Sequence, residues 1–148
     1  MVTLQEITPD NFDQCLALSV DDSQKEFVAS NVKSLAQAWL FPKAAKPFAI
    51  YNSEEMVGFL MLDLDCDYDG TGKKCGLWRF MVDKAHQNKG YGKAALKLAL
   101  QYVKDNCTPE RFSTSYVPGN DHAAGLYRSL GFVETGEIEH GEIVMVLK

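Results

Sequence analysis

The chain lacks the patterns that mark most metal, redox and membrane proteins. Its 4 cysteines include no C-x-x-C pair, which excludes the usual zinc and thioredoxin-type motifs, and its 3 histidines share no metal-ligand spacing. No stretch approaches the roughly 18 consecutive apolar residues of a membrane helix, and Met1 to Glu6 have neither the basic start nor the apolar core of a signal peptide. We therefore expect a cytoplasmic protein that binds no metal and no membrane.

Positive charge is also in short supply. Lysine and arginine number 15 against 20 acidic residues, for a net charge of −5, which does not suit a protein that binds nucleic-acid phosphates. The charge is unevenly distributed. Residues 53–70 hold six acidic and no basic groups, whereas 71–104 hold eight basic groups and one acidic group. This division favours two oppositely charged ligands over nucleic acid.

The periodicity of apolar residues predicts alternating strands and helices along one domain, residues 1–148. Apolar residues at helical spacing predict a first helix from Phe12, a second with Val32, Leu35, Ala36, Trp39 and Leu40 on its apolar stripe, and two more over 90–104 and 120–130. Strands are expected at 2–7, 48–51, 56–62, 75–82, 111–117, 132–138 and 142–147. The order β-α-α-β-β-β-α-β-α-β-β predicts an α/β (α+β) fold, with a mixed sheet covered by helices.

The most informative segment is Val82 to Lys93, a strand end followed by a polar loop and a helix that starts among glycines. Backbone amides at a helix N-terminus favour an anion, and glycine lets that backbone approach phosphate oxygens. A Walker A motif is excluded because Ala94 follows Lys93. A dinucleotide fingerprint is matched formally by Gly90, Gly92 and Ala95, with Glu110 further on, but its first glycine should follow the strand at once. The third motif is Q-x-x-G-x-G, from Gln87 to Gly92.

Together with Asn120-x-x-Ala123-x-x-Leu126-Tyr127-x-x-x-Gly131-Phe132, this motif resembles the acetyl-coenzyme A (acetyl-CoA) site of the GNAT superfamily of N-acetyltransferases. The resemblance covers the whole chain and is strongest to bacterial spermidine/spermine-type enzymes. It implies the GNAT (acyl-CoA N-acyltransferase) fold, with a mostly antiparallel sheet of about seven strands and about four helices. It also implies transfer of acetyl from acetyl-CoA to a primary amine, most simply a small polyamine, by direct attack.

The resemblance implies a role for several residues. The main chain of Phe80, Met81 and Val82 would pair with the pantetheine arm of the coenzyme. The pyrophosphate would lie on the amides of Gln87, Asn88, Lys89, Gly90, Tyr91, Gly92 and Lys93. Asn120 would contact the coenzyme arm, or cap a helix, and Tyr127 would protonate the leaving thiolate as general acid. The alternative for Tyr127 is a core aromatic residue, because Leu126 and Leu130 share its helical stripe.

Aspartates alternate with apolar residues from Asp63 to Asp69, so a strand continuing that far would place four carboxylates on one face. A calcium loop starting at Asp65 is unfavourable because its twelfth position is Gly76 instead of glutamate. A solvated face remains open, and so does an acidic surface at Asp65 and Asp67 that attracts a cationic amine. Asp22 and Glu26 are further candidate substrate contacts, since the loop that holds them lines the acceptor side in the resembling fold.

One residue departs from the resemblance. Trp78 stands on the fourth predicted strand where polyamine acetyltransferases usually carry a carboxylate, which leaves the general base unassigned. A protein N-terminus, an amino acid or an aminoglycoside remains an alternative acceptor, and so does a coenzyme-binding regulatory module without turnover. An open sheet edge would be consistent with a homodimer.

Overall fold

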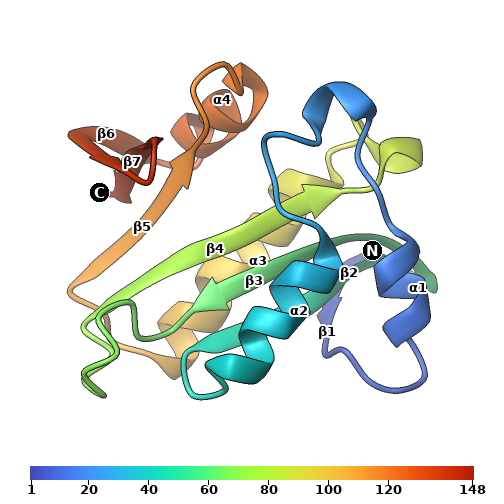
Figure 1. Ribbon diagram of the computed structural model, residues 1–148, viewed down its shortest axis with the longest axis horizontal. Helices are drawn as coiled ribbons and strands as arrows, with labels where there is room; N and C mark the ends of the chain where they lie inside the picture. The colour runs from blue at the N-terminus through green and yellow to red at the C-terminus, as the bar shows by residue number, and fades with distance from the viewer.

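A seven-stranded sheet, in the order β1-β2-β3-β4-β5-β7-β6, runs through the structure, a computed structural model that describes all of residues 1–148 (Figure 1). Only β4 and β5 are parallel neighbours; the other pairs are antiparallel. The strands are β1 (Val2–Gln5), β2 (Ala45–Asn52), β3 (Glu55–Asp63), β4 (Lys74–Val82), β5 (Arg111–Tyr116), β6 (Phe132–Glu139) and β7 (Glu142–Leu147). The helices are α1 (Phe12–Ala17), α2 (Asn31–Leu40), α3 (Tyr91–Asn106) and α4 (Asp121–Ser129), with short 3₁₀ turns η1 (Asp22–Gln24) and η2 (Lys84–His86). The expected order of elements and the mixed, mostly antiparallel sheet are confirmed. None of the helices is long and apolar enough to cross a bilayer.

Apolar residues pack on both faces of the sheet, and the central strand β3 belongs to both cores. Its Leu60 and Leu62 join the larger core, on the face that α3 and α4 cover, whereas Phe59 and Met61 join the smaller core beneath α1 and α2. A strand buried on both sides needs a nearly continuous apolar sequence, and residues 56–62 provide one.

Helix α3 has the apolar stripe that the sequence predicts. Ala95, Leu96, Ala99 and Val103 are all buried against the sheet. Gly90 takes the N-cap position with a φ of 83°, a left-handed conformation that glycine adopts without a Cβ penalty. The helix therefore begins abruptly after a sharp turn, and its first amides are exposed at the end of β4.

The predicted face of α2 is wrong for most of its residues. Val32, Trp39 and Leu40 are 58%, 83% and 68% exposed, and of the large residues in the predicted stripe Leu35 packs against the smaller core. The fully buried residues of the helix are Asn31 and Ser34. The side chain of Asn31 donates to the Cys15 carbonyl of α1 at 2.9 Å, so a polar residue is satisfied inside the interface.

The predicted strand at 56–62 does not continue to Asp69, because β3 ends at Asp63 and the residues up to Lys73 form a loop. The Asp63 carboxylate accepts from the Asp65 amide at 3.0 Å, a short-range bond that competes with continuation of the ladder. No row of four carboxylates along a strand face therefore exists.

Strands β4 and β5 pair over only three positions, Lys74–Arg111, Cys75–Phe112 and Gly76–Ser113. Gly76 allows the strands to approach closely there, since a Cβ at this position would lie 2.8 Å from the Ser113 carbonyl oxygen. Further along, Trp78 is an extra residue in β4 without a partner in β3, a β-bulge that bends a strand. The two strands separate beyond this point (Figure 1).

Candidate active site

A cavity of about 1170 Å³ lies where β4 and β5 separate. Residues from the loop between α1 and α2, from β4, the glycine loop, β5, α4 and the β6–β7 hairpin line it. Pockets for small molecules usually measure about 300–1,000 Å³, so this one has room for a long cofactor and a second substrate.

The β5-facing edge of β4 is unpaired beyond Gly76, and Phe80, Met81 and Val82 line the cavity along it. The Met81 side chain is buried in the smaller core, and that of Phe80 packs against the larger one. Side chains on these opposite faces leave the main-chain edge available. An extended ligand with amide groups can pair with such an edge as an added strand would.

The glycine loop places amides at the same end of the cavity. Asn88 has a φ of 63° and Gly90 one of 83°, and the first amide of the helix to bond its own backbone is that of Ala94, to the Gly90 carbonyl. The amides at the start of α3 therefore have no intrahelical acceptor, as expected for the first turn of a helix. All the predicted loop residues line the cavity except Lys89.

Gly92 is required by packing as well as by ligand access. A Cβ there would lie 2.8 Å from Cζ of Phe80 and 3.3 Å from Cγ2 of Val82. The first turn of α3 thus rests directly on the end of β4, which places the exposed amides beside the unpaired strand edge.

The side chain of Gln87 makes contacts that the motif did not predict. Its Nε2 donates to the Val82 carbonyl at 2.9 Å and to Oε1 of Gln24 at 2.9 Å, while its own Oε1 accepts from Nε2 of Gln24 at 3.2 Å. The Ser19 amide likewise donates to the Asp83 carboxylate at 2.8 Å. The loop after α1 is thereby joined to the glycine loop, so Gln87 acts through its side chain as a connector.

Tyr127 lies on α4, is 5% exposed and lines the cavity. Burial is the main cause that raises the pKa of Tyr127 to about 12, and the negative charge of Glu142 adds to the rise. Hydrogen bonding with the Thr114 side chain acts in the opposite direction and lowers the pKa. Its ring also packs at 5.8 Å from that of Phe132 in the larger core. Tyr127 is therefore a core aromatic and a cavity residue at once. Asn120 caps α4 by accepting from the Ala123 amide at 3.5 Å, and it lines the cavity too.

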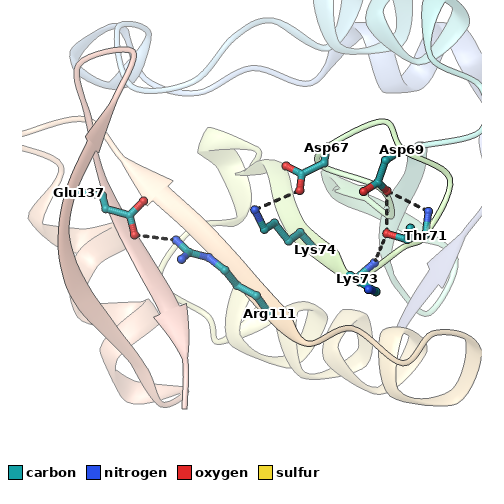
Figure 2. Close-up of polar contacts among 7 residues, drawn as sticks. All are labelled: Asp67, Asp69, Thr71, Lys73, Lys74, Arg111 and Glu137. Atoms are coloured by element: carbon teal, nitrogen blue, oxygen red, sulfur yellow. Dashed lines mark hydrogen bonds and ion pairs between the residues drawn. The ribbon is translucent and has the colours of Figure 1, made fainter.

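The aspartates after β3 are mostly used within their own loop (Figure 2). Asp65 accepts from the Gly70 amide at 2.8 Å, and Asp69 from the Thr71 amide at 2.9 Å. Asp67 forms an ion pair with Lys74 at 3.0 Å. Among the candidate acceptor residues, Asp67 and Glu26 line the cavity, whereas Asp65 and Asp22 do not.

The β6–β7 hairpin forms another wall of the cavity. Its residues were not among the site residues predicted from the sequence. Glu137 pairs with Arg111 at 3.0 Å, and Arg111 stands opposite Lys74 in the parallel register (Figure 2). Glu142 and Ser115 lie further along the same wall. No local motif identifies these residues, because only the pairing of β7 with β5 brings the hairpin to the cavity.

Trp78 belongs to an aromatic group at this end. The Phe41 ring stacks on that of Tyr68 at 5.0 Å and lies 6.2 Å from that of Trp78, and the Arg79 guanidinium lies 5.7 Å from the Trp78 ring. Burial lowers the pKa of Arg79, which donates to the Trp78 carbonyl and to Gln37. On β4 this wall thus presents an aromatic surface and a cation, and no carboxylate.

A sheet whose parallel strands separate around a cavity, with a helix N-terminus opening into it, is the architecture of acetyl-CoA-dependent N-acetyltransferases. The chain belongs to the acetyltransferase (GNAT) family, whose model matches residues 12–132. It is therefore an acetyltransferase of the family that uses acetyl-CoA, and the fold and class expected from the two motifs are confirmed.

Two kinds of relative are informative. The spermine/spermidine N(1)-acetyltransferase of Bacillus subtilis (strain 168) is 33% identical over 98% of this chain and 97% of its own length. A spermidine N-acetyltransferase from Vibrio cholerae, solved with CoA and spermine, superposes with a TM-score of 0.74 at 16% identity, over 98% of this chain and 92% of that one. An aminoglycoside acetyltransferase AAC(6')-Ib solved with coenzyme A reaches 0.80 at 14% identity, over 100% and 95%. The fold alone thus does not decide the acceptor.

Proposed function

We propose that this enzyme acetylates a primary amine of a small polyamine, spermine or spermidine, by direct attack on acetyl-CoA with Tyr127 as the general acid. The observation that carries the proposal is that Tyr127 and the unpaired stretch of β4 line the same cavity. The full-length similarity to the Bacillus subtilis spermine/spermidine enzyme supports the choice of acceptor.

The glycine-loop end of the cavity suits the coenzyme. The main chain of Phe80, Met81 and Val82 would hold the pantetheine arm, and the amides from Gln87 to Lys93 would hold the pyrophosphate. A Cβ built at Gly90 would meet no other atom within 4 Å, so the space beside this residue is open to such a ligand. Lys89 and Lys93 would add positive charge, and Asn120 would contact the arm, since its amide nitrogen is not used by the cap.

Acetyl transfer forms a C–N bond, breaks the C–S bond of the thioester and requires a proton for the sulfur. With a pKa of about 12, the Tyr127 phenol keeps its proton at neutral pH. Donation to a thiolate whose ordinary pKa is about 8.5 is uphill by about 5 kcal/mol if both groups keep these values. Tyr127 therefore has to donate while the C–S bond breaks, in a cavity whose burial also disfavours a free thiolate.

Glu26, from the loop after α1, and Asp67, from the loop after β3, would attract the acceptor to the cavity that they line. Asp22 and Asp65, which do not line it, would act on the acceptor only through their charge. Because Lys74 already neutralises Asp67, an arriving ammonium group would compete with this lysine for the carboxylate. We expect this contact to contribute little, as exposed ion pairs usually do.

The proposal is tested by measuring thiol release from acetyl-CoA with a panel of spermidine, spermine, aminoglycosides, amino acids and a peptide. We expect turnover with the polyamines, and about 10²–10⁴-fold lower kcat for Tyr127→Phe, the usual contribution of a general acid. Tyr102→Phe, a partly buried tyrosine that packs on Phe48 outside the cavity, is the matched control. Preference for another amine would overturn the acceptor, and a fully active Tyr127→Phe would overturn the role of the phenol.

A further inference from the structure

Glu142 opens β7 and lines the cavity on the wall that faces the bulge of β4. Its position is fixed by the ladder, because Ile143 and Val144 pair with Tyr116 and Ser115 of β5. The carboxylate therefore stands on a rigid strand, on the side of the cavity opposite Trp78.

The hydrogen-bonding capacity of this carboxylate is mostly unused. The Ser115 hydroxyl donates to its Oε1 at 3.1 Å, and no other hydrogen bond or ion pair reaches the side chain. Asp67 and Glu137 on the same cavity each have a basic partner at 3.0 Å. An ionised carboxylate accepts about four hydrogen bonds, so Glu142, which is partly buried, has room for a cationic ligand.

The charge of Glu142 also affects the pKa values of residues on α4 and on β4. The negative charge of Glu142 contributes to the high pKa of Tyr127 on α4, and it opposes the lowering of the pKa of Arg79 on β4 by burial. Tyr127, Arg79 and Glu142 line the same cavity, so the charge of Glu142 acts within it. The nucleophilic amine would have to enter this part of the cavity to reach a thioester whose sulfur lies beside Tyr127.

We propose that Glu142 binds the amine of the acceptor at the point of attack, as the carboxylate that β4 lacks at Trp78. The inference rests on the proposed function only in requiring an amine acceptor. A primary amine arrives largely as an ammonium ion, and the Glu142 carboxylate accepts its N–H groups and orients the nitrogen. The ammonium proton leaves to water before attack, and the neutral nitrogen forms the C–N bond. The nitrogen then loses a second proton to water as the C–S bond breaks, the sulfur takes the Tyr127 proton, and water returns a proton to the phenolate.

The test compares Glu142→Gln with Glu54→Gln. Glu54 lies in the turn between β2 and β3, is exposed and does not line the cavity, so the second variant removes the same charge away from the site. Steady-state kinetics with spermidine should show KM raised about 10- to 100-fold in Glu142→Gln, the usual loss for a charge-assisted bond. Glu54→Gln should stay within about threefold of the wild type.

Two further measurements separate binding from folding. The dissociation constant of acetyl-CoA and the midpoint of thermal unfolding should be unchanged in Glu142→Gln, and Glu142→Asp should recover part of the lost KM. Equal KM values for Glu142→Gln, Glu54→Gln and the wild type overturn the inference. If the wild type prefers another amine, the polyamine proposal fails. The KM values of the variants for that amine then test whether Glu142 binds the acceptor. A wild type that acetylates no amine overturns both.

Discussion

Gly92→Ala tests the contact that places the glycine loop beside β4. A methyl group at position 92 would lie 2.8 Å from Cζ of Phe80, closer than such atoms approach, so the ring or the first turn of α3 has to move. Overpacking of this kind costs about 1–3 kcal/mol, against about 1 kcal/mol gained because alanine favours a helix over glycine. The net change in the free energy of unfolding should lie between zero and a loss of about 2 kcal/mol.

Gly125→Ala is the matched control, because Gly125 is an exposed residue of α4 whose added Cβ would meet nothing within 4 Å. This variant should gain about 0.5–1 kcal/mol. Urea denaturation monitored by circular dichroism measures both, and the two variants should differ by about 0.5–3 kcal/mol. Calorimetric titration with acetyl-CoA should show weaker binding for Gly92→Ala alone. Equal stabilities and equal affinities would refute the role assigned to this close contact.

Three further predictions concern other parts of the molecule. The pKa of Tyr127 is about 12 in the folded protein and about 10 when unfolded, so its contribution to stability is present below pH 10 and lost between pH 10 and 12. Over that range the free energy of unfolding should fall by about 2 kcal/mol more in the wild type than in Tyr127→Phe, and parallel curves would contradict the burial of the phenol. Asn31→Ala should cost about 1–3 kcal/mol in urea denaturation, because the buried Cys15 carbonyl loses its side-chain donor, and an unchanged midpoint would rule this out. Trp39→Ser should change the free energy of unfolding by less than about 0.5 kcal/mol, since the indole is 83% exposed; a larger loss would mean that it packs in the core.

The elements that the sequence predicts correctly are those in which apolar periodicity and local turn chemistry agree. In α3 the buried stripe is also the most apolar one, and Gly90 marks where the helix starts. In α2 the two signals disagree. Three of its large apolar residues, Val32, Trp39 and Leu40, are exposed. The buried face begins at Asn31, whose partner on α1 lies 16 residues away and cannot be found from periodicity.

The candidate site divides in the same way. The residues of the glycine loop and Tyr127 lie in contiguous motifs, and the cavity brings them together. The acceptor wall does not follow from a motif. Asp65 lies in a loop, where its carboxylate accepts from the Gly70 amide. Glu142 reaches the cavity only through the pairing of β7 with β5. Long-range strand pairing, which a single sequence leaves unspecified, therefore determines the part of the site that we propose binds the amine.

The paired amides of Gln24 and Gln87 have a consequence for the order of events. They join the loop that carries the proposed acceptor residues Asp22 and Glu26 to the loop proposed to hold the pyrophosphate. Whatever change in affinity for one substrate is transmitted through this contact must appear as the same factor in the affinity for the other. The two dissociation constants thus close a thermodynamic cycle, and titration of the enzyme in either order measures the same coupling.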